Sequence, residues 1–190
     1  MTSLTQLFES LSPPEAARRL LGCEFVRTID GREARVRIVE TEAYHQSDAA
    51  SHSYNGRTQR TDVMFGPAAH LYVYFTYGMH YCCNVVSGPV GTGAGTLIRA
   101  VEPVEGTELL QRNRDRSGID LTNGPAKLCQ AMAIRREMNG HDLEQAPLRL
   151  VLNPALENDQ IVESTRVGIS KAVDVPWRFY VKDNPYVSKS

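Results

Sequence analysis

The chain lacks the features that mark membrane-spanning and secreted proteins. Its 190 residues contain no apolar run of about 18 residues, the length that a membrane-spanning helix needs. The opening stretch, MTSLTQLFES, has no basic region followed by an apolar one, so no secretory signal is indicated. We therefore expect a cytoplasmic protein.

Cysteine and histidine are too few and too scattered to suggest a metal site. The four cysteines, Cys23, Cys82, Cys83 and Cys129, form no C-x-x-C pair, and no H-E-x-x-H occurs among the five histidines. Adjacent residues of a strand point to opposite faces, so Cys82 and Cys83 cannot readily share one metal ion. We expect reduced thiols, no bound metal and no cofactor.

Lysine is scarce among the positively charged residues. The chain has 4 Lys against 17 Arg, and its formal net charge is −1. The planar fork of Arg suits phosphate better than the point charge of Lys. A high-GC coding bias explains the same excess, and the net charge does not by itself indicate a nucleic-acid partner.

Local patterns at the start of the chain predict a helix and then a hairpin. Ser12 is a candidate N-cap, followed by Pro13 in the first turn and by Glu15 at the position of a capping box, and Gly22 ends the helix. Residues 23–40 read as two strands around an Asp-Gly turn. The glycine-rich residues 87–95 precede TLIRAVEP, which reads as a strand, so a dinucleotide-binding loop is excluded because that loop needs a helix after it.

The rest of the chain predicts more strands around a small number of helices. Helices are predicted over 103–114 and 124–138, each with a Pro near its start, and LRLVL, QIVES and RFYVK predict short strands in the last 45 residues. Composition is that of an ordinary globular chain, with 42% hydrophobic and 23% charged residues. We expect one α+β domain over residues 1–190, with a mainly antiparallel sheet.

Acidic and aromatic residues alternate at the end of one predicted strand. Val36 and Ile38 share a face, and continued alternation puts Glu40, Glu42 and Tyr44 on that same core side. A buried carboxylate beside an aromatic ring is a candidate general base. The alternative is that the strand ends at Glu40 and leaves Glu42 in a solvated loop.

Four of the eight tyrosines lie in the stretch LYVYFTYGMHYCCNVV, residues 71–86. They are Tyr72, Tyr74, Tyr77 and Tyr81, and a Gly follows Tyr77. This pattern predicts a hairpin with Tyr77 at its tip. Simple packing of a tyrosine-rich sheet is the other interpretation of this stretch.

Six motifs together resemble the 3-methyladenine (alkyladenine) DNA glycosylase family, in the single-domain form found in bacteria and mammals. They are RIVETEAY, AASHS, MFGP, LYVYFTYGMHYCCNVV, TLIRAVEP and NGPAKLCQAMAI, and the tail RVGIS with PWRFYVKDNPYVS looks like the closing segment of that family. The resemblance covers about residues 20–187. It implies an enzyme of base-excision repair that flips a damaged purine out of duplex DNA and hydrolyses its N-glycosidic bond. It also implies a curved sheet with a protruding hairpin that inserts into DNA.

The resemblance assigns roles to nine residues. It implies that Glu42 is the general base for a water molecule, which Arg99 and the backbone carbonyl of Val167 help to hold. It further implies that Tyr44, His52 and Tyr74 form a stacking pocket for the flipped base. Asn84 would be the polar group that selects among bases, and Tyr77 and Met79 would be the side chains that enter the DNA.

The chemistry implied by the resemblance needs few groups. Glycosidic cleavage passes through an oxocarbenium-like state, and a purine alkylated at a ring nitrogen is already a cation that leaves without a strong acid. None of the nine residues with an assigned role is a lysine, so we expect a monofunctional enzyme that forms no Schiff base and leaves an abasic site. Its partner would be double-stranded DNA with damaged purines, and we expect a monomer, associated with the nucleoid if the source is bacterial.

Two residues depart from the pattern of the family. Asp62 stands where the family usually has Asn, and Ala69 stands where it usually has Gly. A carboxylate near a loop that faces DNA opposes phosphate binding, and an Ala restricts the backbone before the strand.

Two other functions fit parts of the sequence. In a nucleoside or small-glycoside hydrolase, Glu40 and Glu42 would act as a pair of carboxylates about 6.6 Å apart, the separation of residues i and i+2 on a strand. A non-catalytic binder of single-stranded nucleic acid would use the tyrosines as a stacking platform. Activity on free nucleosides would favour the hydrolase, and activity only on duplex DNA would exclude it.

Overall fold

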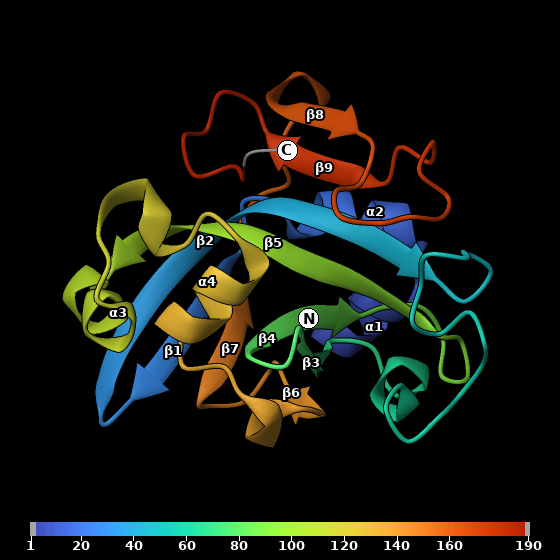
Figure 1. Ribbon diagram of the computed structural model, residues 1–190, viewed down its shortest axis with the longest axis horizontal. Helices are drawn as coiled ribbons and strands as arrows, with labels where there is room; N and C mark the ends of the chain where they lie inside the picture. Colours follow the sequence, from blue (N-terminus) through green and yellow to red (C-terminus); the bar gives the residue numbers. More distant parts are fainter. Residues whose placement is uncertain (1–2, 189–190) are drawn as a thin grey trace.

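Two long strands cross the middle of the molecule side by side (Figure 1). They are β2 (Arg32–His45) and β5 (Ala94–Glu105), in a computed structural model that describes residues 3–188. The other strands are β1 (Glu24–Ile29), β3 (His70–Thr76), β4 (His80–Val86), β6 (His141–Asp142), β7 (Leu148–Val151), β8 (Ile161–Ser164) and β9 (Arg178–Val181). The α-helices are α1 (Leu4–Glu9), α2 (Pro13–Leu20), α3 (Thr107–Arg114) and α4 (Pro125–Ala131), and short 3₁₀ turns cover Asp62–Phe65, Gly118–Leu121, Arg136–Met138 and Asn158–Gln160.

The strands of residues 3–188 form one curled sheet in which each pairing is antiparallel. Its order is β6-β3-β4-β5-β2-β1-β7, and β9 pairs with β2 beyond the end of β1 and carries β8 on its other edge. Helices α1, α2 and α4 contribute to one hydrophobic core against the sheet, and α3 packs on α4 (Figure 1). The expected α+β class, with a curved, mainly antiparallel sheet and flanking helices, is confirmed.

The two hairpins lie where the sequence predicts them. Asp30 and Gly31 join β1 to β2 with positive φ angles of 49° and 74°, the pattern of a type I′ turn. Tyr77 and Gly78 join β3 to β4 with φ angles of 52° and 67°. The second turn therefore holds a large aromatic residue in a conformation that glycine adopts more easily.

Helix α2 also follows the prediction. Ser12 and Glu15 form the capping box, and Gly22 follows the last turn with a φ of 80°, in the left-handed region. Its buried Ala16, Ala17 and Leu20 face the sheet, and α2 packs against β2 and β5. The sequence analysis did not predict α1, which is only 6 residues long.

Both helices predicted in the middle of the chain are shorter than expected. Pro103 belongs to β5 and not to a helix, so α3 begins only at Thr107. The part of β5 that contains Pro103 has no strand on its other edge, because β4 pairs only with residues 95–97, so the missing N–H of Pro103 breaks no ladder. The helix predicted over 124–138 ends at Ala131, and a separate 3₁₀ turn covers Arg136–Met138.

Irregular pairing between β2 and β5 changes the face that the β2 side chains present. Val39 is an extra residue in β2, and Arg99 is an extra residue in β5 on the other side of the Glu40–Ala100 pair. After this point Thr41 bonds to the carbonyl of Ala17 in α2, and Ala43 joins the main core. Simple alternation from Val36 therefore predicted the wrong face for the two glutamates, although both are fully buried as expected.

The core extends on both sides of the central strands. A large cluster joins α1, α2 and α4 to the sheet, and a smaller one of Met64, Phe65, Tyr72 and Val86 lies beneath the β3–β4 hairpin. No helix in the described part of the chain is both long and apolar enough to cross a membrane.

Candidate active site

One cavity of about 570 Å³ collects most of the residues singled out in the sequence. It opens beside the β3–β4 hairpin. Eight of the nine candidate residues line it: Glu42, Tyr44, His52, Tyr74, Tyr77, Asn84, Arg99 and Val167. The ninth, Met79, lines a separate hollow of about 330 Å³ on another side of the hairpin, together with residues of α4.

A single row of paired residues across the sheet forms one wall of this cavity. Directly paired residues of neighbouring antiparallel strands present their side chains on the same face. The row runs from β3 through β4 and β5 to β2, as Tyr72, Asn84, Leu97 and Glu42. All four line the cavity, so the sheet register brings aromatic, amide and carboxylate groups together although they lie far apart in the sequence.

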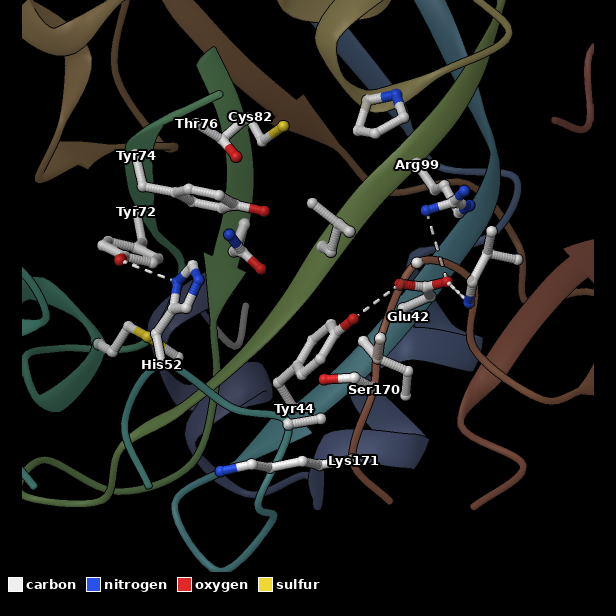
Figure 2. Close-up of a pocket in the computed structure, with 18 of the residues that line it drawn as sticks. Glu42, Tyr44, His52, Tyr72, Tyr74, Thr76, Cys82, Arg99, Ser170 and Lys171 are labelled. Carbon is white, nitrogen blue, oxygen red and sulfur yellow. Dashed lines mark hydrogen bonds and ion pairs between the residues drawn. The ribbon is translucent and has the colours of Figure 1, made fainter. Parts of the chain in front are cut away.

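Glu42 lies at one end of this row with both carboxylate oxygens bonded. Its Oε1 accepts a hydrogen bond of 2.8 Å from the N–H of Val167 and lies 3.5 Å from Nη1 of Arg99. Its Oε2 accepts a hydrogen bond of 2.8 Å from the hydroxyl of Tyr44 (Figure 2). Glu42 is thus a fully buried carboxylate held by three separate parts of the chain. The backbone group of Val167 in contact is the N–H, and the expected role of its carbonyl stays a prediction.

Arg99 reaches Glu42 from the irregular position in β5. Its side chain is 12% exposed, and its Nε lies 3.2 Å from Glu40 Oε1. Glu40 is also fully buried, bonds to Arg178 at 2.7 Å, and does not line the cavity. Although the two glutamates are close in sequence, only Glu42 faces the space where a ligand could lie.

Three aromatic rings stand together at the other side of the cavity. Tyr72 and Tyr74 stack with their ring centroids 5.5 Å apart, and His52 meets Tyr74 edge to face at 4.6 Å. Tyr44 lies across the cavity from them (Figure 2). The gap between Tyr44 and this group is a slot with aromatic walls, which suits a flat ring.

Burial keeps the titratable groups of the slot uncharged. Desolvation raises the pKa of the Tyr44 hydroxyl, and the negative charge of Glu42 raises it further. Desolvation likewise raises the pKa of Tyr74 and lowers that of His52, the latter with help from the charge of Arg60. At neutral pH the slot therefore presents phenols and a neutral imidazole, although His52 as a whole residue is exposed.

Asn84 and Cys82 supply polar atoms next to the rings. Asn84 is buried, and it lines the cavity. Cys82 pairs with Tyr74 across the hairpin, and burial raises the pKa of its thiol to about 11. The amide of Asn84 can thus bond to a ligand, while Cys82 stays a neutral thiol.

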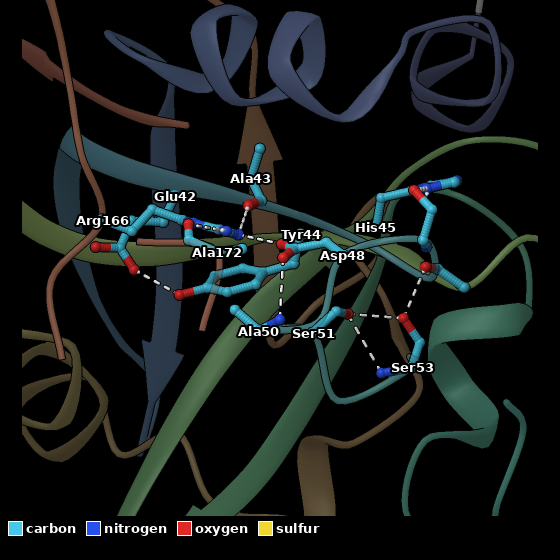
Figure 3. A network of polar contacts seen from close by, with 12 residues as sticks. Glu42, Ala43, Tyr44, His45, Asp48, Ala50, Ser51, Ser53, Arg166 and Ala172 are labelled. Carbon is cyan, nitrogen blue, oxygen red and sulfur yellow. Dashed lines mark hydrogen bonds and ion pairs between the residues drawn. The ribbon is translucent and has the colours of Figure 1, made fainter. Parts of the chain in front are cut away.

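The loops that carry His52 and Val167 are tied together behind Tyr44 (Figure 3). Arg166 is fully buried, forms an ion pair with Asp48, and donates to the carbonyl of Ala43 at 2.9 Å. Its guanidinium carbon lies 4.7 Å from the centre of the Tyr44 ring, on which it packs. Asp48 begins the loop that leads to His52, so one arginine fixes both sides of the slot.

Sequence reasoning missed several residues that the fold brings to the site. They include Arg166, whose carboxylate partner Asp48 lies 118 positions away, Cys82 and Lys171, which line the cavity, and Arg60 beside the Tyr74 ring. Arg60 lies 5.9 Å from the Tyr74 ring centre, and the exposed Lys171 lines the cavity with its amine pointing away from Glu42 (Figure 2). The excess of Arg over Lys was the one feature of the sequence that drew attention to positively charged side chains, and it did not indicate which of these side chains flank the site.

Within residues 3–188 no group of three or more His, Cys, Asp or Glu side chains is arranged to hold a metal ion. All four cysteines are free and buried.

Comparison with known proteins gives a consistent result over almost the whole chain. The family described as "Methylpurine-DNA glycosylase" matches residues 6–185. A protein of Carboxydothermus hydrogenoformans is 51% identical over 176 residues, which cover 91% of this chain and 92% of that protein. Proteins of Francisella tularensis and Methanoculleus marisnigri are each 48% identical, and cover 92% and 91% of this chain and 93% and 92% of their own lengths. All three carry the name "Putative 3-methyladenine DNA glycosylase".

Proposed function

The chain belongs to the methylpurine-DNA glycosylase family, and on that premise we propose that it flips an alkylated or otherwise damaged purine out of duplex DNA and hydrolyses the N-glycosidic bond. A water molecule activated by Glu42 attacks the anomeric carbon, and an abasic site remains. The enzyme acts as a monomer on double-stranded DNA.

The arrangement around Glu42 is the observation that carries this proposal. An ionised carboxylate has about four lone-pair sites, and Tyr44, Val167 and Arg99 occupy three of them. Glu42 lines the cavity, so we propose that the remaining site accepts a hydrogen bond from one water molecule. A water molecule bound there touches its proton acceptor, Glu42, and directs its oxygen toward the ligand. Little of its rotational freedom then remains to be lost when it reacts.

The aromatic slot supports a purine as the ligand. A flat base can stack between Tyr44 and the group of His52 and Tyr74, and Asn84 can bond to its edge. The neutral His52 does not repel a base that already carries a positive charge from alkylation. Such a base departs as a neutral molecule when the glycosidic bond breaks, so Glu42 alone can serve the water without a strong acid at the leaving group.

The hairpin tip supports insertion into the DNA. The side chain of Tyr77 is 84% exposed and that of Met79 69%, which is unusual for large apolar groups. Unstacking a base costs a few kcal/mol, and a ring that fills the vacated space recovers part of that cost. Tyr77 lines the cavity that would receive the flipped base, so it fits the gap beside that base.

The two departures from the family pattern have small consequences for this function. Asp62 forms an ion pair with Arg57, which offsets its charge toward DNA. Ala69 has a φ of 58°, in the left-handed region, so a glycine at this position would be less strained. Neither residue touches Glu42 or the aromatic slot.

The contacts of Glu40 oppose a glycoside hydrolase with two catalytic carboxylates. Glu40 is bonded to Arg178 and Arg99 and lies outside the cavity, so it has no access to a sugar. A non-catalytic binder would have no use for a buried carboxylate beside its stacking platform. Both alternatives make predictions that differ from ours for the variant Glu42→Gln.

Glu42→Gln tests the proposed function directly. It keeps the shape of the side chain and removes the base, so we expect single-turnover excision from lesion duplexes to fall about 100-fold or more while binding is kept. Excision is measured on duplexes with different damaged purines, binding by fluorescence polarisation, and free nucleosides serve as the comparison substrate. Undiminished turnover in Glu42→Gln, or wild-type activity on nucleosides alone, would refute the assignment.

A second experiment tests the proposal that the enzyme does not cut the strand. Cleavage by β-elimination needs an amine that forms a Schiff base with the sugar, and Lys171 is the lysine at the cavity. Because its amine points away from Glu42, we expect borohydride to trap no adduct during turnover (Figure 2). Lys171→Ala is the matched control, since a trapped adduct that disappears in this variant would contradict monofunctional action and identify the nucleophile.

A further inference from the structure

Arg99 is held more closely by a residue outside the cavity than by Glu42. Its Nε lies 3.2 Å from Glu40 Oε1, while its Nη1 lies 3.5 Å from Glu42 Oε1. Glu40 is fully buried and is also bonded at 2.7 Å by Arg178. The two carboxylates and the two guanidiniums form a buried group with balanced charge, in which the position of Arg99 depends on that of Glu40.

Ser188 touches three of these four charged side chains. Its N–H donates to Glu40 Oε2 at 2.7 Å, and its hydroxyl donates to Glu40 Oε1 at 3.0 Å. The same hydroxyl accepts a hydrogen bond of 3.1 Å from Arg99 Nε, and the carbonyl of Ser188 accepts one of 3.2 Å from Arg178. Ser188 is 8% exposed and lies outside the cavity.

We propose that Ser188 is a positioning residue for the hydrolysis: by holding Glu40 and Arg99 together, it fixes the guanidinium in the orientation in which Nη1 faces Glu42. This inference rests on the proposed function. A misplacement of about 1 Å at a catalytic group can cost about 100-fold in rate, so a contact that fixes Arg99 affects the reaction without touching the substrate.

The hydroxyl of Ser188 is suited to this task because it donates and accepts at once. A serine hydroxyl offers one O–H and two lone pairs, and here the O–H goes to Glu40 while a lone pair receives the N–H of Arg99. Alanine can do neither, and threonine can do both. In Ser188→Ala the backbone N–H still reaches Glu40 and Arg99 keeps its direct contact with Glu40, so the variant removes only the two bonds of the hydroxyl.

The test compares Ser188→Ala and Ser188→Thr with the wild type. We expect Ser188→Ala to lower the single-turnover rate at saturating enzyme about tenfold, the effect of one or two bonds to charged groups, and to change the Kd for lesion duplex less than about twofold. Ser188→Thr should stay within about threefold of the wild-type rate, since it keeps the hydroxyl.

Asn184→Ala is the matched control in the same segment. Asn184 bonds to Glu102 and to the N–H of Tyr186 and touches neither Glu40 nor Arg99, so its loss loosens the segment without altering the charged group. We expect Asn184→Ala to keep the wild-type rate. An unchanged rate in Ser188→Ala, or an equal loss in Asn184→Ala, would overturn the positioning role.

A spectroscopic measurement separates this inference from the proposed function. In protein labelled at arginine Nε, the Nε–H of Arg99 should exchange slowly with solvent and should exchange about tenfold faster in Ser188→Ala. That result does not depend on which substrate is used. If the wild type excises no damaged purine, the proposed function fails; if the exchange rate is the same in both proteins, the role of Ser188 fails.

Discussion

Tyr44 connects the two halves of the site through one side chain. Its hydroxyl donates to Glu42, its ring forms one wall of the slot, and Arg166 packs on that ring. Because burial raises the pKa of the hydroxyl, it stays protonated and remains a donor at neutral pH. Stacking of a base on this ring and the orientation of the carboxylate are therefore linked.

The titration of His52 leads to a prediction about pH. Its pKa is lowered from the ordinary value of 6.5, so it is neutral at pH 7 and becomes a cation only at a pH below 6.5. A protonated His52 repels a cationic base such as 7-methylguanine but not a neutral one such as hypoxanthine. In a Glu42→Gln background, which prevents excision, we expect affinity for the cationic lesion relative to the neutral one to fall as the pH is lowered from 7 toward 5.

His52→Gln is the control for this pH effect, because it keeps a polar side chain that does not titrate. The ratio of the two affinities, measured by fluorescence polarisation, should then be independent of pH over the same range. A ratio that falls equally in both proteins would assign the effect to another group.

The sequence predicted which residue types gather at the site but not how they touch. Motif order placed Glu42 among the candidates, although simple alternation gave it the wrong face, and the Gly after Tyr77 indicated the hairpin tip, because these signals are local. The bonds from Val167 to Glu42, from Ser188 to Glu40 and from Arg166 to Asp48 join residues more than 100 positions apart. Such contacts depend on the sheet register and on loop paths, which no local pattern encodes.

At the scale of elements, the β3–β4 hairpin makes the clearest prediction. If Tyr77 fills the space of a flipped nucleotide, Tyr77→Ser should lower single-turnover excision by about 5-fold to 150-fold, which corresponds to the 1–3 kcal/mol of one base–aromatic stack. Tyr77→Phe and Tyr77→Trp keep a flat ring and should recover much of the rate. The excision rate in Tyr77→Ser should fall less for a lesion in a bulge, which is already easy to flip, than for a lesion in a stable base pair.

Stability measurements distinguish this role from sheet packing. Tyr77 has a φ of 52°, so Tyr77→Gly removes both the ring and the backbone strain, and we expect its melting temperature to equal or exceed that of the wild type. Ile119→Ser, at another exposed apolar residue, should change neither excision nor melting temperature. A large drop in the melting temperature of Tyr77→Ser would indicate that this tyrosine only packs against the sheet.

The elements themselves were predictable to different degrees. Caps and turns with Gly, Pro and Asp identified α2 and the first hairpin, since these residues act on their own neighbours. The start of α3 was wrong because Pro103 is tolerated on a free sheet edge as well as in a first helical turn. Only the tertiary pairing of β5 with β2 decides whether Pro103 lies on a sheet edge or in a first helical turn.

At the scale of the whole molecule, most positive charges are already used within the protein. The net charge is −1, and arginines such as Arg35, Arg99, Arg166 and Arg178 have carboxylate partners. We expect weak binding to undamaged duplex, with a slope of log K against log salt of about −2 to −4, because few cations remain for phosphate.

Arg60 and Lys171 flank the cavity without a carboxylate partner in the described chain, so they are the first candidates for phosphate contact. Arg60→Ala should make the salt slope shallower by about 0.9, the contribution of one phosphate. Arg32→Ala, an exposed arginine at the start of β2, is the control and should leave it unchanged. Equal salt slopes in the wild type and in Arg60→Ala would show that Arg60 makes no contact with a DNA phosphate.

The paired irregularities of β2 and β5 have a consequence for how this sequence can change by insertion and deletion. The extra residue at Val39 and the extra residue at Arg99 cancel, so the register is the same before and after them. Loss of either one alone would shift the ladder by one residue and turn every later side chain to the opposite face, Glu42 and Tyr44 included. In a library of single-residue deletions, this short stretch of both strands should be the least tolerant part of the sheet, and a double deletion of one residue from each strand should restore folding but not excision, since Arg99 would lose its place in the bulge.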